Sequence, residues 1–333
     1  MMNEPLVIKN EKCSVIPIEY NIMLKQNQYS FGGVPLSEKD FEWLLDYCKD
    51  SKSLIIFDFS YIEFVDDRLF QKLTESRVRD NVGIAHIKDN KLISKEFYHE
   101  MEDEGIMEEN GIVYFSNKYT EMIKNIGLDG LYQEKIREIV HMTMESWESM
   151  SGWKSGEYGY LSSSGVYSNK IIDLKKLFYS HRDTLYIVLQ LYHRIKEWDG
   201  KYDYLVATSK NGVAIGSILS DILHKELLCL NIGQMFEEIY NMMPAIKKGK
   251  KYVHIFDMIC IGSEIKVANA LISAKGGEMV KSFGVVCMQN LEAIQKYNRF
   301  SALKNVTALI EYKDLKMDYM ISLDNPINEG DKN

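Results

Sequence analysis

The sequence predicts an α/β protein with a parallel sheet in its C-terminal half and a smaller α/β domain before it. From residue 183 onward, segments with helical periodicity alternate with strand-like runs, as in a parallel sheet joined by helices. The runs YDYLVAT, VHIFD and FGVVCM lack polar alternation, which is typical of strands covered by helices on both faces. The chain has 333 residues, 46% of them hydrophobic, enough for two buried cores.

Three segments are expected along the chain: a small α/β domain over 1–95, a helical connector over 96–150 and the sheet domain over 151–333. The first should centre on a buried strand from Leu54 to Phe59. A helix in YIEFVDDRLFQKLTE and a second strand in VGIAHI would follow it.

The connector is rich in acidic residues and contains an amphipathic stretch in which Ile136, Ile139, Val140 and Met144 repeat at helical spacing. We expect this face to pack against a neighbouring domain. A membrane-binding helix would carry a lysine-rich polar face, whereas this one mixes both charge signs.

The composition disfavours several classes of function. A formal net charge of -8 disfavours a nucleic-acid partner, and the sequence has neither a membrane-spanning run nor a signal peptide, so we expect a cytoplasmic protein. Its five cysteines show no CxxC spacing and its histidines no HxxxH spacing, so no metal site is proposed. A small-molecule or protein ligand is favoured.

The strongest motif is YVHIFDMICIGSEIKVANALISAKGG, a strand, a tight loop after Asp257 and a helix. The backbone N–H groups of the loop and the positive end of the helix dipole would bind a phosphate, while Asp257 could accept hydrogen bonds from sugar hydroxyls. The alternative is a connecting turn whose aspartate caps the helix. The predicted phosphate-binding residues are Cys260, Ile261, Gly262, Ser263 and Glu264.

A second loop follows the strand YDYLVAT and precedes a helix from residue 212. Lys210 would neutralise the charge of an anionic ligand and Gly212 would allow close approach of the backbone. The alternative is an ordinary turn with a solvated lysine. The predicted residues of this loop are Thr208, Ser209, Lys210, Asn211 and Gly212. Ligands bind beyond the carboxyl ends of parallel strands, so both loops should lie at one site.

Two further segments of the C-terminal half are candidates for parts of a ligand site. The stretch YGYLSSSGVYSNKIIDLKKLF places Ser164 and Gly165 in a loop before an edge strand. The stretch NIGQMFEEIYNMMPAIKKGKKY lies between two strands and contains no histidine, and its lysines around Gly249 are typical of a solvated turn.

Between Tyr158 and Gln289 these motifs, in this order, resemble the type I phosphoribosyltransferases, and orotate phosphoribosyltransferase most of all. The resemblance implies that Asp257 binds the ribose, the 260–264 loop its 5′-phosphate and the 208–212 loop the diphosphate of phosphoribosyl diphosphate. Ser164 and Gly165 would then lie on the side of the base. It also implies Mg²⁺ carried by the phosphates, and a homodimer.

The chain departs from this family pattern at several positions. Phe256 replaces the first of two adjacent acids, Cys260 and Ile261 replace loop hydroxyls, Glu264 replaces a small residue, and Ser163 replaces a lysine. A carboxylate at Glu264 disfavours a dianion, although it could instead stabilise the start of its helix. Two hypotheses follow: a phosphoribosyltransferase with lost or changed activity, or a non-catalytic sensor of nucleotides or phosphoribosyl diphosphate that acts in regulation or protein interaction.

The order of elements in 1–95 resembles STAS-like domains, although the loop from Val65 to Arg68 lacks their phosphorylatable serine. This resemblance implies a protein partner for the N-terminal domain; an unrelated α/β unit is the alternative.

Overall fold

The computed structural model describes residues 4–26, 37–60, 62, 72, 79–86, 107–146, 159–161, 166–168, 170–230, 245–288, 305–316 and 320–326. The chain forms two units, Met1–Lys135 and Ile136–Asn333, each with its own sheet. Within the described residues, no helix is long and apolar enough to cross a membrane.

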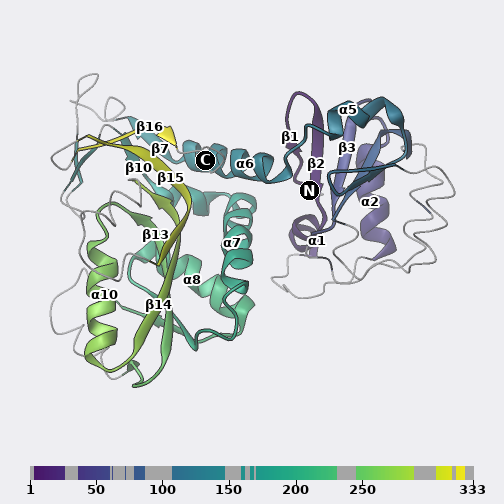
Figure 1. Ribbon diagram of the computed structural model, residues 1–333. Helices are drawn as coiled ribbons and strands as arrows, with labels where there is room; N and C mark the ends of the chain where they lie inside the picture. The colour runs from purple at the N-terminus through teal and green to yellow at the C-terminus, as the bar shows by residue number, and fades with distance from the viewer. Residues whose placement is uncertain are drawn as a thin grey trace. The chain divides into compact units, whose positions relative to one another are not determined.

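Unit 1 is built on a six-stranded sheet in the order β1-β2-β3-β4-β6-β5 (Figure 1). Its three central strands β2, β3 and β4 are parallel, and the outer strands pair antiparallel. The strands are β1 (Ile8–Lys9), β2 (Cys13–Pro17), β3 (Leu54–Asp58), β4 (Val82–Ala85), β5 (Met107–Glu109) and β6 (Ile112–Tyr114), and the helices are α1 (Ile18–Gln26), α2 (Glu38–Cys48) and α5 (Thr120–Ile123).

The core of unit 1 forms between the sheet and α2, which contributes the fully buried Phe41 and Leu44. Phe41 packs on Phe57 of β3 at a ring-centroid distance of 5.9 Å. The strands predicted near Leu54 and in VGIAHI are confirmed as β3 and β4. Of the segment predicted to form a helix after β3, only Ile62 and the helical Lys72 are described; the rest, with the 65–68 loop, lies outside the described residues.

The segment predicted to be a helical connector also contains two β-strands. Strands β5 and β6, joined at Asn110 and Gly111, pair with each other and extend the sheet of unit 1. Both turn residues have positive φ, 52° and 70°, as a tight hairpin turn requires, and Asn-Gly is a strong hairpin signal that the acidic composition obscured. Helix α6 (Leu128–Met142) follows, and its Ile136, Ile139 and Val140 are buried. Met144, predicted on the same helical face, lies beyond the helix in β7 (Met144–Ser146).

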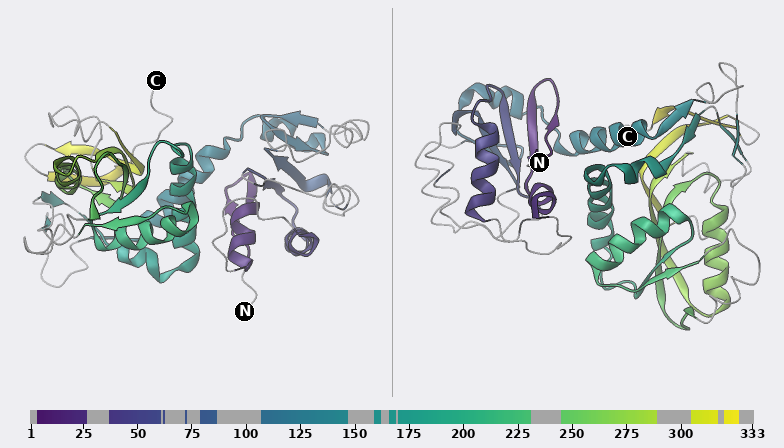
Figure 2. Two further views of the ribbon diagram at one scale, coloured as in Figure 1. Left: turned by 90° about the horizontal axis from the view of Figure 1, so that it is seen from below. Right: turned by 180° about the vertical axis from the view of Figure 1, so that it is seen from behind.

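Unit 2 contains an eight-stranded sheet in the order β12-β11-β13-β14-β15-β16-β9-β8, of which β12 to β15 are parallel. Helix α10 covers one face of its parallel part, and α7 and α8 cover the other (Figures 1 and 2). The strands are β8 (Gly159–Leu161), β9 (Val166–Ser168), β11 (Tyr204–Ala207), β12 (Leu227–Cys229), β13 (Lys251–Ile259), β14 (Glu278–Cys287), β15 (Val306–Lys316) and β16 (Met320–Pro326).

The helices of unit 2 are α7 (His181–Lys196), α8 (Lys210–Leu223) and α10 (Ser263–Ala274), and a separate ribbon pairs β7 (Met144–Ser146) with β10 (Lys170–Ile172). The predicted fold class, a parallel α/β sheet with a smaller α/β domain before it, is confirmed. The elements predicted from residue 183 to the strand FGVVCM are all present.

The centre of the parallel sheet depends on a close contact between β13 and β14. Phe256 pairs with Gly284 in the strand register, and its ring covers the position where a Cβ on Gly284 would lie, 2.1 Å from the ring. Phe256 is 1% exposed and packs with Ile259 and Ile265. A glycine at 284 is therefore required by the phenylalanine at 256.

We expect Gly284→Ala to lower the free energy of unfolding by about 2 kcal/mol, because the ring of Phe256 is enclosed and cannot move away. Gly130→Ala in α6 is the control: nothing lies within 4 Å of its added Cβ, so it should leave stability unchanged or raise it slightly. Urea unfolding of both variants measures the difference. Equal free energies of unfolding for the two variants would show that Phe256 leaves room for a side chain at position 284.

Candidate functional site

The two predicted loops meet at the carboxyl edge of the parallel sheet. One connects β11 to α8 and the other connects β13 to α10, and β11 and β13 are hydrogen-bonded neighbours. A cavity of about 200 Å³ lies there, lined by Ser209, His254 and the continuous segment 256–265. The site therefore combines the starts of two helices with the end of a buried strand.

Asp257 joins the two loops. Its carboxylate accepts a hydrogen bond from Ser209 Oγ at 2.6 Å and another from Asn211 Nδ2 at 2.9 Å. Asp257 is 9% exposed, so these donors replace much of the water that a free carboxylate would bind. The aspartate in this structure holds the 208–212 loop on β13.

Ser209 has a second role as the N-cap of α8, since its Oγ accepts the N–H of Gly212 at 2.9 Å. A Cβ on Gly212 would lie 2.8 Å from Ser209 Oγ and 3.1 Å from the carbonyl oxygen of Ile255. Glycine at 212 thus allows the start of α8 to approach β13 closely. The predicted approach of the backbone to a diphosphate stays a prediction; the close approach in this structure is to protein.

The loop before α10 starts the helix without a side-chain cap. Gly262 occupies the cap position with a φ of 75°, a conformation that favours glycine. The first N–H groups of a helix have no partner within it, so this end can bind an anion. Cys260 is buried and its thiol donates to Met288 Sδ at 3.2 Å, which ties the loop to the end of β14.

A buried polar chain runs behind this loop from Glu264 to His254. Thr208 Oγ1 donates to Glu264 Oε2 at 3.3 Å and lies 3.0 Å from His254 Nε2. A hydroxyl has one proton, so the imidazole is the donor in the second contact. Within the described part of the chain, the other ring nitrogen, Nδ1, is buried without a hydrogen-bond partner.

Burial shifts the pKa values of the titratable side chains in this hydrogen-bonded series. Burial lowers the pKa of His254 to about 3, so the imidazole is neutral at physiological pH. Burial also raises the pKa of Glu264, the negative charge of Asp257 raises it further, and the hydrogen bond from Thr208 opposes both. Beside Asp257, the cavity wall therefore carries a second carboxylate, Glu264, that takes up a proton more readily than usual.

The structure brings most of the predicted residues together. Thr208, Ser209, Asn211, Gly212, Asp257 and Glu264 are connected by contacts described above, and 260–264 line the cavity. Lys210 is exposed in the first turn of α8. Ser164 and Gly165 lie outside the described residues. The lysines around Gly249 lie at the opposite end of β13, where Lys250 forms an ion pair with Asp203 at 3.0 Å.

His254 also lines this cavity, although it was not predicted as a site residue. Strand alternation puts residues 254 and 256 on the same face of β13, and their rings stack at a centroid distance of 6.1 Å. The position of a histidine two residues before Phe256, on the same face of the predicted strand, could therefore have indicated that His254 lies at this site.

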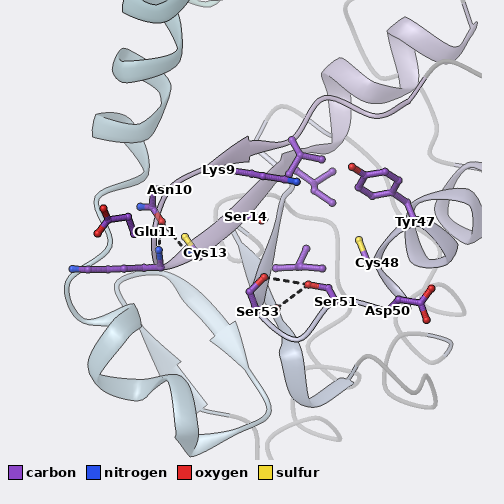
Figure 3. Close-up of a pocket in the computed structure, with 14 residues that line it drawn as sticks. Lys9, Asn10, Glu11, Cys13, Ser14, Tyr47, Cys48, Asp50, Ser51 and Ser53 are labelled. Atoms are coloured by element: carbon purple, nitrogen blue, oxygen red, sulfur yellow. Dashed lines mark hydrogen bonds between the residues drawn. The ribbon is translucent and has the colours of Figure 1, made fainter.

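A second cavity, of about 340 Å³, lies in unit 1 between the β1–β2 hairpin and the end of α2 (Figure 3). Cys13 and Cys48 line it, and burial raises the pKa of their thiols to about 11 and about 12. Both thiols are therefore protonated at neutral pH, which makes them poor nucleophiles and poor metal ligands. Among the described residues, no cluster of three or more His, Cys, Asp or Glu could hold a metal ion.

We expect Ser209→Ala to lower the free energy of unfolding of unit 2 by about 1–2 kcal/mol, because it removes the cap of α8 and one hydrogen bond to Asp257. Ser217→Ala, on the exposed side of the same helix, is the matched control and should change stability by less than about 0.5 kcal/mol. Thermal unfolding measures both. Similar losses in the two variants would contradict a special role for Ser209.

Fold and site together define an α/β protein with a candidate anion-binding cavity at the carboxyl edge of a parallel sheet. No model of a known protein family matches the sequence. The chain is similar to an adenine phosphoribosyltransferase of Petrotoga mobilis, with 26% identity over 144 residues, covering 38% of this chain and 79% of that protein. This similarity supports the predicted resemblance to phosphoribosyltransferases.

Solved structures similar to this chain include two enzymes of the same kind. Adenine phosphoribosyltransferase from Thermoanaerobacter pseudethanolicus is 16% identical, with a TM-score of 0.39 over 54% of this chain and 99% of that one. Orotate phosphoribosyltransferase from Aeropyrum pernix is 12% identical, with a TM-score of 0.36 over 57% of this chain and 91% of that one.

Proposed function

We propose that unit 2 binds a phosphorylated ribose compound, phosphoribosyl diphosphate or a related nucleotide, and that its transfer activity is lost or changed. The observation that carries this proposal is the pair of helix starts, at α8 and α10, that Asp257 holds together beside one cavity. Helix N-termini favour phosphate groups. The similarity to an adenine phosphoribosyltransferase supports the same class of ligand.

Two features support an altered reaction. Phe256 is enclosed in the core, so this position supplies no acceptor for a ribose hydroxyl. Glu264 adds a carboxylate to the cavity wall, where a dianionic phosphate would meet like charge. A ligand should therefore bind more weakly than at a site without this carboxylate, unless Glu264 is protonated or a cation accompanies the ligand.

Mg²⁺ is the cation that we expect with a diphosphate ligand, since it is usually bound by one or two carboxylates together with phosphate oxygens. The donor set fits, because Glu264 places a carboxylate in the cavity wall. The bound ion would neutralise phosphate charge there.

The second candidate function is a non-catalytic sensor of nucleotides or phosphoribosyl diphosphate. It is favoured by Asp257, whose two carboxylate oxygens are both engaged by protein donors. If this function is correct, unit 1, for which the sequence predicts a STAS-like domain, would bind a protein partner. Cytoplasmic location and homodimer formation are also part of the proposal.

Calorimetry and a pyrophosphate-release assay on the full chain test the function. Phosphoribosyl diphosphate with Mg²⁺ and several nucleotides are the ligands, and adenine and orotate are the first bases. Binding with turnover supports a transferase whose reaction is changed, and binding without turnover supports lost transfer activity and, with it, the sensor. No binding to any of these ligands would overturn both.

Glu264→Gln should tighten binding of ribose 5-phosphate about tenfold at neutral pH without Mg²⁺, because it removes a like charge. In the unaltered chain, affinity should rise as pH falls through the raised pKa of Glu264, because the protonated form does not repel the phosphate. The glutamine variant should lose the part of the pH dependence that comes from Glu264.

Calorimetry over a pH series measures the effect. Glu278→Gln, at the exposed start of β14, is the control and should behave like the unaltered chain. Unchanged affinity in Glu264→Gln would place the phosphate elsewhere.

A further inference from the structure

Unit 1 contains a buried cluster of hydrogen bonds around Asp58, the last residue of β3, that the proposed function does not use. Asp58 is 4% exposed. It accepts the N–H of Ser60 at 2.9 Å and the Nδ1 proton of His86 at 2.8 Å. The hydroxyl groups of Ser60 and Tyr132 also donate to it. Four donors from three parts of the chain thus meet at one carboxylate.

This carboxylate is ionised despite its burial. Burial raises the pKa of Asp58, but the hydrogen bond and charge of His86, with hydrogen bonds from Ser60 and Tyr132, outweigh burial and hold it below its usual range. An unpaired buried charge is costly, so the positive charge of a protonated His86 stabilises the cluster. The imidazole itself is 37% exposed, so solvent protons can reach it.

The backbone holds His86 in an uncommon conformation. Its φ is 59°, which is rare for a residue other than glycine, and its N–H donates to the carbonyl oxygen of Gly111 at 3.3 Å. Such conformations persist only when the surroundings impose them. The contact with Gly111 and the pair with Asp58 both hold the imidazole at the end of β3.

Tyr132 connects this cluster to α6. It lies in the first half of the helix, which continues past the division between the units at residues 135 and 136. Its hydroxyl is a tertiary contact between α6 and the sheet of unit 1. The other titratable residues on the elements that carry the cluster, β3, β4 and α6, all lie on α6: Asp129, Glu134, Lys135, Arg137, Glu138 and His141.

We propose that protonation of His86 controls how firmly the first half of α6 is held on unit 1, through Asp58 and Tyr132. With His86 protonated, the ion pair keeps Asp58 in place to accept the Tyr132 hydroxyl. When His86 loses its proton, Asp58 is left as a buried charge with neutral donors, and the cluster weakens. The contact is strongest in mild acid and loosens as the pH rises through the titration of His86.

Amide hydrogen exchange on the full chain tests this proposal. Exchange of residues 128–135, corrected for the intrinsic effect of pH, should be about tenfold slower near pH 6 than near pH 8.5. His86→Gln should remove this pH dependence and leave fast exchange at both pH values. His141→Gln, an exposed histidine in the last turn of the same helix, is the matched control and should keep it.

Tyr132→Phe keeps the ring and removes the hydroxyl, and it carries the test if His86→Gln does not fold. It should exchange rapidly in 128–135 at both pH values, while the amides of β2 stay as slow as in the unaltered chain. Exchange that is independent of pH in the unaltered chain would overturn the proposal. So would a pH dependence that survives His86→Gln, or one that affects β2 as strongly as α6.

Discussion

The candidate site depends on the carboxylate of Asp257 and its hydrogen bonds to Ser209 and Asn211. These bonds fix the start of α8 on β13, and Gly212 allows the helix to lie close enough for them to form. Without them, two neighbouring strands would still end at the same edge, but their loops would have no common partner. The arrangement of the cavity wall therefore follows from one aspartate and the small residues opposite it.

The same aspartate was predicted from the sequence, but in a different role. A strand ending in an acid, followed by glycine and a helix, indicated an anion site next to a sugar acceptor. Asp257 lies two residues before the end of β13 rather than at its last residue, and its carboxylate is already engaged with protein donors. Sequence patterns fix where a side chain lies on its element. They do not show which donors from a distant loop will reach it.

Much of unit 2 could be predicted, because its strands are apolar runs that alternate with amphipathic helices. Unit 1 was less predictable. Helix α2 was missed although Ser37 caps it, and β5 and β6 were hidden in an acidic stretch although Asn110 and Gly111 mark their turn. The partners of His254 and Tyr132 could not be assigned from sequence, since Thr208 and Asp58 are 46 and 74 residues away along the chain.

The packing of Phe256 on Gly284 limits how this site can change. An acid at position 256 would leave space where the ring now lies and place a charge among Ile259, Ile265 and other apolar side chains. A substitution at this one position is therefore a costly way to place a second carboxylate beside Asp257. Introducing one would need paired changes on β13 and β14, because the single substitution passes through a variant of low stability.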